Sequence, residues 1–230
     1  MQLGFTRFIK LLLQNLFIQT SWSFTTLQGM GFLTNLLSGA SEDKKDLILN
    51  NHKGFFNTHP YMSAYIVGAV TRLYDEGKKS PDEIKHFIAI AQTSLASSGD
   101  LLFWETIRPS LLIIAVILSL KFGLWGIFTF IIPYNILHFY HRITGILDGY
   151  RLGPDVIYLL NSARFKKVQQ AFEIIGTIAA GLLILLVQGD NNSLILIPLI
   201  PLFISMSIYR LPATFYTVSI ILIVIIFALL

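Results

Sequence analysis

The feature that most constrains the fold is a series of apolar segments in the second half of the chain. They lie at roughly 108–120, 122–140, 171–188, 194–209 and 211–230. A helix that crosses a bilayer needs about 20 apolar residues, and in lipid all backbone polar groups must be bonded within the protein. Composition agrees, because 54% of the 230 residues are hydrophobic and only 13% are charged, with a mean hydropathy of +0.66. Soluble domains carry about a quarter charged residues. The sequence therefore predicts an all-α integral membrane protein.

The N-terminal part is more polar and is predicted to contain shorter helices. We expect them at about 5–20, 22–38, 42–55, 60–76 and 81–96, and no segment alternates as a strand would. The first is interpreted as an amphipathic surface helix that is retained in the mature chain. Ser41 and Ser80 are expected N-caps, and Pro81 is expected at the first helical position after Ser80.

One apolar stretch, from Arg108 to Tyr140, carries residues that interrupt helices. These are Lys121, Gly123, Gly126 and Pro133. Broken or re-entrant helices are tolerated at membrane depth where protein or water meets the freed backbone groups, and they often line transport paths. We therefore expect amphipathic and broken helices over residues 1–160 and about three transmembrane helices over 161–230, within a single membrane subunit.

Charge near the C-terminal segments predicts their orientation. The basic run 164–167 precedes the first segment and Arg210 separates the last two, whereas the linker 188–192 has no base. Cytoplasmic loops are enriched in Lys and Arg. The three segments are thus expected to cross in turn, with the C-terminus outside.

Several classes of function find no support in the sequence. The net charge of +4 is scattered, which argues against a nucleic-acid surface. Cysteine is absent and no His, Asp or Glu spacing suits a metal, so neither a thiolate site nor any other metal site is expected. Phosphate loops, dinucleotide fingerprints and nucleophile elbows are also missing. Glu105 and Arg108, spaced i and i+3, are expected to form an ion pair instead of an acid–base couple. No catalytic centre is identified, and no cofactor is expected.

Four short islands combine polar side chains with aromatic rings, as a sugar site requires. A sugar presents hydroxyls at its edges and C–H groups on its faces, so it needs amide or carboxylate partners and a flat ring. Candidate hydrogen-bonding partners are Gln19, Gln28, Asn57, His59 and Asp100, and candidate aromatic faces are Trp22 and Trp104.

Each candidate also has a purely structural interpretation. Asn57 before Pro60 can mark a helix junction, and His59 can be a satisfied structural histidine. Asp100 can be the N-cap of a helix that begins at Leu101, and the two tryptophans can mark the membrane interface. The residues alone leave these alternatives open.

Taken in order, the islands resemble a known family. The motifs are QTSWSFTTLQGMGF, HKGFFNTHPYMSAYIVG, SLASSGDLLFWETIRPSL and DGYRLGPDVI, which lie between about Asn15 and Ile157. Together they resemble the IID membrane component of the mannose, fructose and sorbose family of the bacterial sugar phosphotransferase system. Four motifs in the same order are far more specific than any one of them.

The resemblance implies a multi-pass subunit of the bacterial cytoplasmic membrane that pairs with a IIC subunit. The pair would form the path for a hexose or related sugar. Phosphoryl groups would pass through soluble carriers, including IIA, to a histidine of IIB, which phosphorylates the sugar as it enters. The IID subunit would form no phosphoprotein intermediate, and His59 would position groups without doing chemistry.

The chain departs from the family pattern at several polar positions. Ser23, Thr25 and Thr26 stand where the family commonly has an amide, an acid and a base, and TSLASSGD replaces a glycine-rich loop. Tyr74 and Asp75 stand where it has paired glutamates. An alternative is therefore a divergent structural or regulatory partner of a IIC-like subunit that transports nothing.

Overall fold

The structure, a computed structural model, describes residues 3–159 and 162–188, together with positions 198, 201, 202, 219, 222 and 223. The helices are α1 (Phe5–Leu16), α2 (Gly29–Gly39), α3 (Glu42–Asn51), α4 (Ser63–Glu76), α5 (Pro81–Gly99), the π-helix η1 (Asp100–Ile107), α6 (Arg108–Phe122), the 3₁₀ turn η2 (Gly123–Ile127), α7 (Phe128–Leu152), the 3₁₀ turn η3 (Gly153–Asp155), α8 (Val156–Leu159) and α9 (Ala163–Gln188). β pairing in these ranges is limited to isolated bridges from Leu27 to Ser23 and to Phe56. The described chain is therefore all-helical, as predicted.

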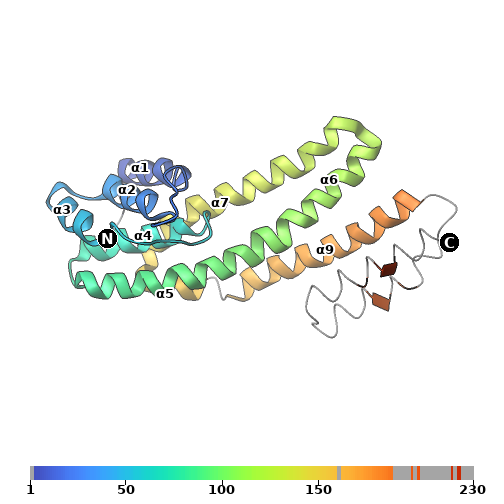
Figure 1. The fold of residues 1–230 in the computed structure, drawn as a ribbon. Helices are drawn as coiled ribbons and strands as arrows, with labels where there is room; N and C mark the ends of the chain where they lie inside the picture. The colour runs from blue at the N-terminus through green and yellow to red at the C-terminus, as the bar shows by residue number, and fades with distance from the viewer. Residues whose placement is uncertain are drawn as a thin grey trace.

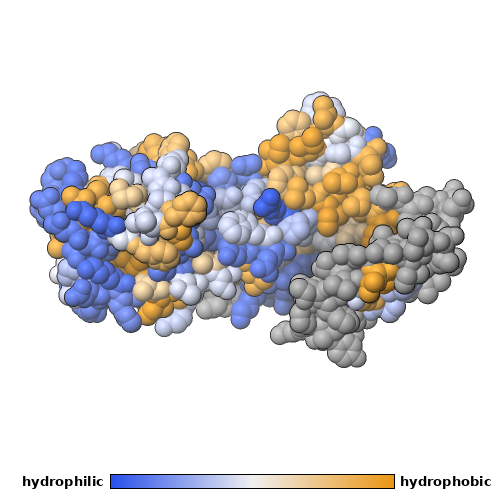
Figure 2. All heavy atoms as spheres, viewed as in Figure 1, coloured by the Kyte–Doolittle hydropathy of each residue, from blue (hydrophilic) through white to orange (hydrophobic). Residues whose placement is uncertain are grey.

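The helices form a polar body with an apolar arm. In Figure 1, α1 to α4 gather around the start of α5, while α6, η2 and α7 form a long hairpin that α9 accompanies. The face seen in Figure 2 is largely hydrophilic over the body and hydrophobic over the hairpin. Two helical stretches of the described chain, Pro81–Leu159 and Phe165–Ile184, contain windows long and apolar enough to cross a membrane.

Helix α4 is the centre of the body, and it packs directly on the backbone of α7. A Cβ added to Gly68 would lie 2.3 Å from the carbonyl oxygen of Ile146, and one added to Gly149 would lie 2.2 Å from that of Tyr65. Small residues let helix backbones approach closely in this way. The crossing fixes where the polar side chains of α7 lie relative to α4.

Most expected N-terminal helices are present but begin later or end earlier. Residues 17–28 form turns and bridges instead of continuing α1 or starting α2. Ser80 is an N-cap as predicted, in a capping box with Glu83 and with Pro81 at the start of α5. The sequence thus predicted which helices exist better than it predicted the residues at which they begin and end.

The prediction that the helix starting at Pro81 ends near 96 is wrong, and so is the prediction that Asp100 is an N-cap. The backbone at Asp100 is helical, with φ −61° and ψ −48°, and its N–H bonds to the carbonyls of Ala96 and Ser97. A continuous rod of α5, η1 and α6 runs through this point. An N-cap side chain requires free backbone N–H groups, and none is freed here.

The expected ion pair between Glu105 and Arg108 is also wrong, since it is not among the ion pairs of the described residues. Glu105 lies in η1, where bonds run from i to i+5 and the turn is wider than in an α-helix, and Arg108 is the first residue of α6. Side chains three residues apart therefore do not lie above one another as they would in an α-helix.

The predicted break in the stretch 108–140 is found at η2. Gly123 ends α6 with a φ of +57°, a conformation that favours glycine. Pro133, in contrast, lies inside α7 and does not end that helix. The chain reverses once, between Lys121 and Phe128, which makes α6 and α7 a hairpin.

The first of the three C-terminal segments is confirmed as a helix, α9, which begins at Ala163, before the expected 171. The segments at 194–209 and 211–230, the linker after Gln188 and Arg210 lie outside the described residues apart from single positions.

Candidate functional site

The segment from Asn57 to Tyr61 lies along one face of the α5 and η1 rod. The Asn57 N–H donates to Oε1 of Gln92 at 3.2 Å, and the Thr58 hydroxyl donates to the Gln92 carbonyl at 3.0 Å. Two turns further on, a Cβ on Gly99 would lie 2.4 Å from Cβ of His59. Only glycine at position 99 lets His59 approach this closely, so His59 packs on the rod at the residue that precedes Asp100.

His59 is enclosed by aromatic rings. Its ring stacks on Phe103 at 5.2 Å between centroids and contacts Trp104 at 5.0 Å and Tyr61 at 4.9 Å. Its exposed fraction is 1%. Burial lowers the pKa of His59 to about 3, and the positive charge of Arg142 adds to this effect.

The neutral imidazole of His59 retains one unused donor. The Tyr61 N–H donates to Nδ1 at 3.3 Å, so Nδ1 is an acceptor and the hydrogen of the neutral ring is on Nε2. Nε2 has no hydrogen-bond partner among the described residues. A buried polar atom without a partner costs about 1–3 kcal/mol. A hydrogen-bond acceptor that reached Nε2 of His59 would therefore stabilise this ring.

Gln28 packs against this segment and is bonded to its backbone. It is 2% exposed. Its Nε2 donates to the Thr58 carbonyl at 2.8 Å, and its Oε1 accepts from the Thr58 N–H at 3.2 Å. Both hydrogen-bonding ends of the amide are thus used by the backbone of one residue, Thr58, so Gln28 supports the shape of the segment.

Asn57, Asp100 and Trp104 are the accessible candidates near His59. The Asn57 side chain is exposed, Trp104 is 48% exposed, and Asp100 is half-buried. The carboxylate of Asp100 has no hydrogen bond or ion pair with any residue of the described ranges. An unpaired carboxylate, an exposed amide and a half-exposed ring therefore belong to residues at, or within two positions of, the contacts that enclose His59.

Gln19 and Trp22 are not brought to this cluster by any contact of the described residues. Gln19 is exposed in the turn that follows α1. Trp22 is 47% exposed, and its ring meets the edge of Phe24 at 5.0 Å. Both stay on the surface of the loop between α1 and α2.

Helix α7 supplies residues to the cluster that were not expected from the sequence. The Tyr61 hydroxyl donates to that of Tyr134 at 3.2 Å, and its ring lies 4.6 Å from His138 and 5.3 Å from the Arg142 guanidinium. The run HFYHR at 138–142 is the signal that marks this face, because aromatic and basic residues recur there at helical spacing.

Arg142 is a buried cation without an acidic partner among the described residues. It is 5% exposed, and its Nη1 donates to Oδ1 of Asn15 at 2.7 Å and also to the Asn15 carbonyl. Asn15 in turn donates to the Ser63 hydroxyl at 3.0 Å. These bonds join α1, α4 and α7, while Nε of Arg142 has no partner.

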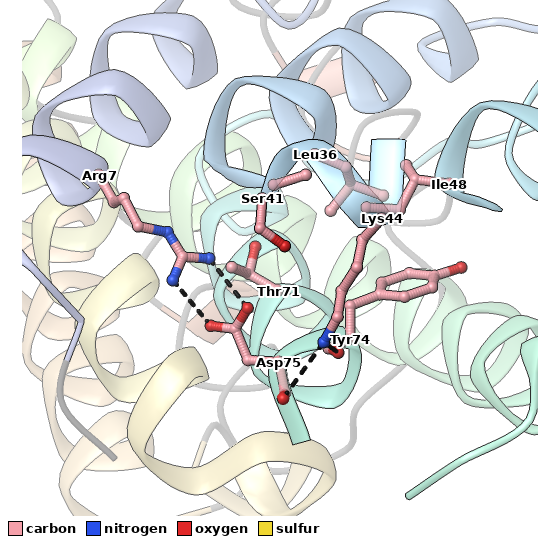
Figure 3. A pocket seen from close by; sticks show the side chains of 9 residues that line it. Arg7, Leu36, Ser41, Lys44, Ile48, Thr71, Tyr74 and Asp75 are labelled. Carbon is pink, nitrogen blue, oxygen red and sulfur yellow. Dashed lines mark hydrogen bonds and ion pairs between the residues drawn. The ribbon is translucent and has the colours of Figure 1, made fainter. Parts of the chain in front are cut away.

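A second polar cluster, at the C-terminal end of α4, has a structural role. Arg7 donates two hydrogen bonds of 3.0 Å to the carboxylate of Asp75, which also accepts from the Tyr150 hydroxyl at 2.8 Å, as Figure 3 shows in part. Lys44 bonds the carbonyls of Tyr74 and Asp75. The cavity between them is only about 10 Å³, about the room that a single water needs.

The side chains at several positions that depart from the family motifs form hydrogen bonds within the chain. The Ser23 hydroxyl lies 2.9 Å from that of Thr26 and accepts from its N–H at 3.2 Å. The Tyr74 hydroxyl pairs with His52 Nε2 at 2.6 Å, and burial raises the pKa of Tyr74 to about 12. His52 also borders a cavity of about 210 Å³ with Phe55, Lys85 and Gln92.

Known proteins resemble the chain over most of the described region. The Escherichia coli K12 protein named PTS system mannose-specific EIID component is 27% identical over 180 residues, which cover 74% of this chain and 63% of that protein. The fructose permease IID component of Bacillus subtilis is 26% identical, covering 73% and 64%. The chain thus spans less than two thirds of the length of these relatives.

Solved structures agree with the sequence comparison. The cryo-EM structure of the mannose transporter ManYZ in complex with microcin E492 includes a chain with a TM-score of 0.61 and 25% identity, which covers 79% of this chain and 70% of that one. A second solved membrane protein, 20% identical, has the same fold, with a TM-score of 0.71 over 98% of this chain and 96% of its own. The family described as PTS system mannose/fructose/sorbose family IID component matches residues 2–188, and the chain therefore belongs to that family.

Proposed function

We propose that the chain is the IID membrane subunit of a sugar phosphotransferase system and forms, with a IIC subunit, the path for a hexose or related sugar. IIB, charged through IIA, would phosphorylate the sugar as it enters. Relatives named for mannose and fructose support the substrate class. The absence of a nucleophile from the motifs suits a subunit whose chemistry is done by another protein.

The observation that carries this proposal is the unpaired carboxylate of Asp100, which directly follows Gly99, the residue that packs on His59, and begins the helical turn that holds Trp104. A sugar hydroxyl is a natural donor to that carboxylate, and a ring face such as Trp104 suits its C–H surface. Asn57 lies at the accessible end of the same segment and would bind a second hydroxyl. Gln19 and Trp22 would contact sugar only if the partner subunit brought them near, and Gln28 acts through Thr58.

The π-helix η1 supports the same assignment. π-Helical turns are rare, lose α-helical bonds and occur frequently at functional sites. Here the turn begins at Asp100 and includes Trp104. The backbone thus departs from regular α-helix geometry at the residues that would contact the sugar.

The location proposed is the bacterial cytoplasmic membrane, with more than one crossing. The apolar windows in Pro81–Leu159 and Phe165–Ile184 support it. The basic run at 164–167, at the body end of α9, favours a cytoplasmic position for the body.

The test is sugar uptake and phosphorylation in cells that supply the cognate IIA, IIB and IIC proteins. Asp100→Asn should lower uptake at least tenfold, because it replaces a charge-assisted hydrogen bond to the sugar with a weaker neutral one. Asn57→Ala should do the same, because it removes a hydrogen bond to the sugar. Neither should lower the melting temperature of the purified chain. Asp82→Asn, on an exposed carboxylate of α5, is the matched control and should change neither quantity.

Other outcomes separate the alternatives. Gln28→Ala should lower the melting temperature, since it leaves both the backbone N–H and the carbonyl of Thr58 without these partners. Normal uptake in the Asp100 and Asn57 variants would refute the site. No phosphorylated sugar with the unchanged chain, despite stable assembly with IIC, would favour the non-transporting partner.

A further inference from the structure

Helix α7 carries a polar stripe to which the proposed function gives no role. The stripe consists of Tyr134, Asn135, His138 and Arg142. Three of these residues are four positions apart, and Asn135 stands two helical turns before Arg142, so all four lie on one side of the helix. The helix belongs to a stretch with an apolar window long enough to cross a membrane. A polar side on such a helix requires an explanation.

The stripe faces the rod formed by α5, η1 and α6. The ring of Tyr134 meets that of Phe103 in η1 at 6.2 Å. Tyr61 lies between the two helices, because its ring contacts Phe103 at 4.8 Å and His138 at 4.6 Å. In Figure 1, α6 and α7 diverge from η2 toward the body, and the stripe is on the inner side of this hairpin. Since Tyr61 also contacts His59, the stripe is continuous with the proposed sugar site.

The opposite side of α7 has the character of a lipid-facing surface. It presents exposed aliphatic side chains, which include Ile132, Ile143 and Leu147. Polar residues of membrane helices almost always face the interior of a bundle or a water-filled cavity, and they mark substrate pathways. The division of α7 into an apolar outer side and a polar inner side therefore indicates an aqueous or polar surrounding inside the hairpin.

Two members of the stripe have free hydrogen-bonding groups. Asn135 is exposed, its amide nitrogen donates to the Ile131 carbonyl at 2.7 Å, and its Oδ1 accepts from no described residue. His138 is half-buried, and neither of its ring nitrogens has a hydrogen bond within the described ranges. Arg142 is buried and bonded to Asn15. The available groups of the stripe are thus an amide and an imidazole, and neither is an obligatory charge.

We infer that Asn135 and His138 bind hydroxyl groups of the sugar from the α7 side, across the hairpin from Asp100 and Trp104. An amide and a neutral imidazole each donate and accept hydrogen bonds, which is what a hydroxyl requires of its partners. A charged ligand would find no available counter-charge on the stripe. The inference rests on the proposed function, because it requires a hexose at the His59 cluster.

The experiment uses the absence of cysteine from the sequence, which lets single thiols be introduced one at a time. Asn135→Cys, His138→Cys and Asn57→Cys are each placed in the full chain, assembled with the cognate IIC subunit in membranes, and treated with a water-soluble thiosulfonate. The probe for protection is an excess of mannose, fructose and sorbose together, the sugars for which the family is described. Each variant loses one side chain that would bind the sugar, so the three are matched.

All three thiols should react, because a thiol in contact with water ionises and becomes nucleophilic. The sugars should slow each reaction at least about fivefold, as they shield the occupied fraction of the sites. Ile132→Cys and Ile143→Cys, on the outer side of α7, are the controls. They should react only after the membrane is dissolved and the chain unfolded.

A second measurement is the kinetics of sugar uptake. Asn135→Ala should raise the KM for uptake about fivefold or more, because one hydrogen bond to the sugar is lost, with no change in melting temperature. Asn51→Ala is the matched control, since the Asn51 amide also donates to the carbonyl four residues earlier, that of Leu47. It should leave the KM unchanged.

The outcomes separate this inference from the proposed function. Sugars that protect Asn57→Cys but neither Asn135→Cys nor His138→Cys would overturn the inference alone. Protection of none of the three thiols would refute the proposed sugar site and the inference with it. Thiols at 135 and 138 that stay unreactive in the membrane assembly would show that a partner helix covers the stripe, which also overturns the inference.

Discussion

Gly149→Ala tests the central packing of the body, where α7 meets α4. The new Cβ would lie 2.2 Å from the Tyr65 carbonyl oxygen, whereas an ordinary contact is at least 3.4 Å. The helices must therefore separate by about 1.2 Å, because the atoms of α4 that the new Cβ meets are backbone atoms, which cannot rotate away. Overpacking of this kind costs about 1–3 kcal/mol, and we take the upper end, about 3 kcal/mol.

The intrinsic helix preference of alanine offsets part of this cost. Alanine is favoured over glycine by about 1 kcal/mol inside a helix, so the net loss should be about 2 kcal/mol. For a chain of this size that is a fall of about 4–8 °C in melting temperature. The control is Gly181→Ala in α9, where an added Cβ would have no atom within 4 Å and stability should stay equal or rise.

The assay is thermal unfolding of the purified full chain in detergent, followed by tryptophan fluorescence. The two substitutions are chemically identical, so their difference isolates the helix contact. If Gly149→Ala and Gly181→Ala agree within about 0.5 kcal/mol, the close crossing of α4 and α7 is refuted.

Two further predictions concern buried polar groups. Asp75→Asn should cost about 2–3 kcal/mol in denaturant unfolding, less than for a fully buried pair because the Arg7 side chain is 35% exposed, while Glu42→Gln on a surface pair should cost under about 0.5 kcal/mol. Acid should destabilise the chain through His52 and His59, whose pKa values burial lowers to about 4 and about 3, so the unfolded state binds more protons below pH 6.5. Each histidine should cost about 2 kcal/mol at pH 5 relative to pH 7.5, and His59→Gln should remove about half of the combined effect. A melting temperature that does not change between these pH values would contradict the assignment.

Local signals predicted several parts of the fold because their physics is local. The Ser80 cap with Pro81 needs only neighbouring residues, and it begins α5 as expected. Gly123 ends α6 because a positive φ favours glycine. Sequence reasoning failed at Asp100, since an acid is a preferred N-cap residue, and only the backbone of the rod shows that the helix continues through this point.

The sequence by itself determined that this is a helical membrane protein of the IID family, because apolar segment length, helix signals and ordered motifs are properties of the chain. Only the tertiary structure decided which of the candidate residues contact one another. Gly99 admits His59 to the rod, Gly149 brings α7 against α4, and Arg142 reaches Asn15 over 127 positions. Such encounters depend on backbone approach between distant helices, which no local pattern encodes. For that reason only the three-dimensional structure shows that Gln28 supports the backbone of Thr58 and that the carboxylate of Asp100 is an unpaired acceptor.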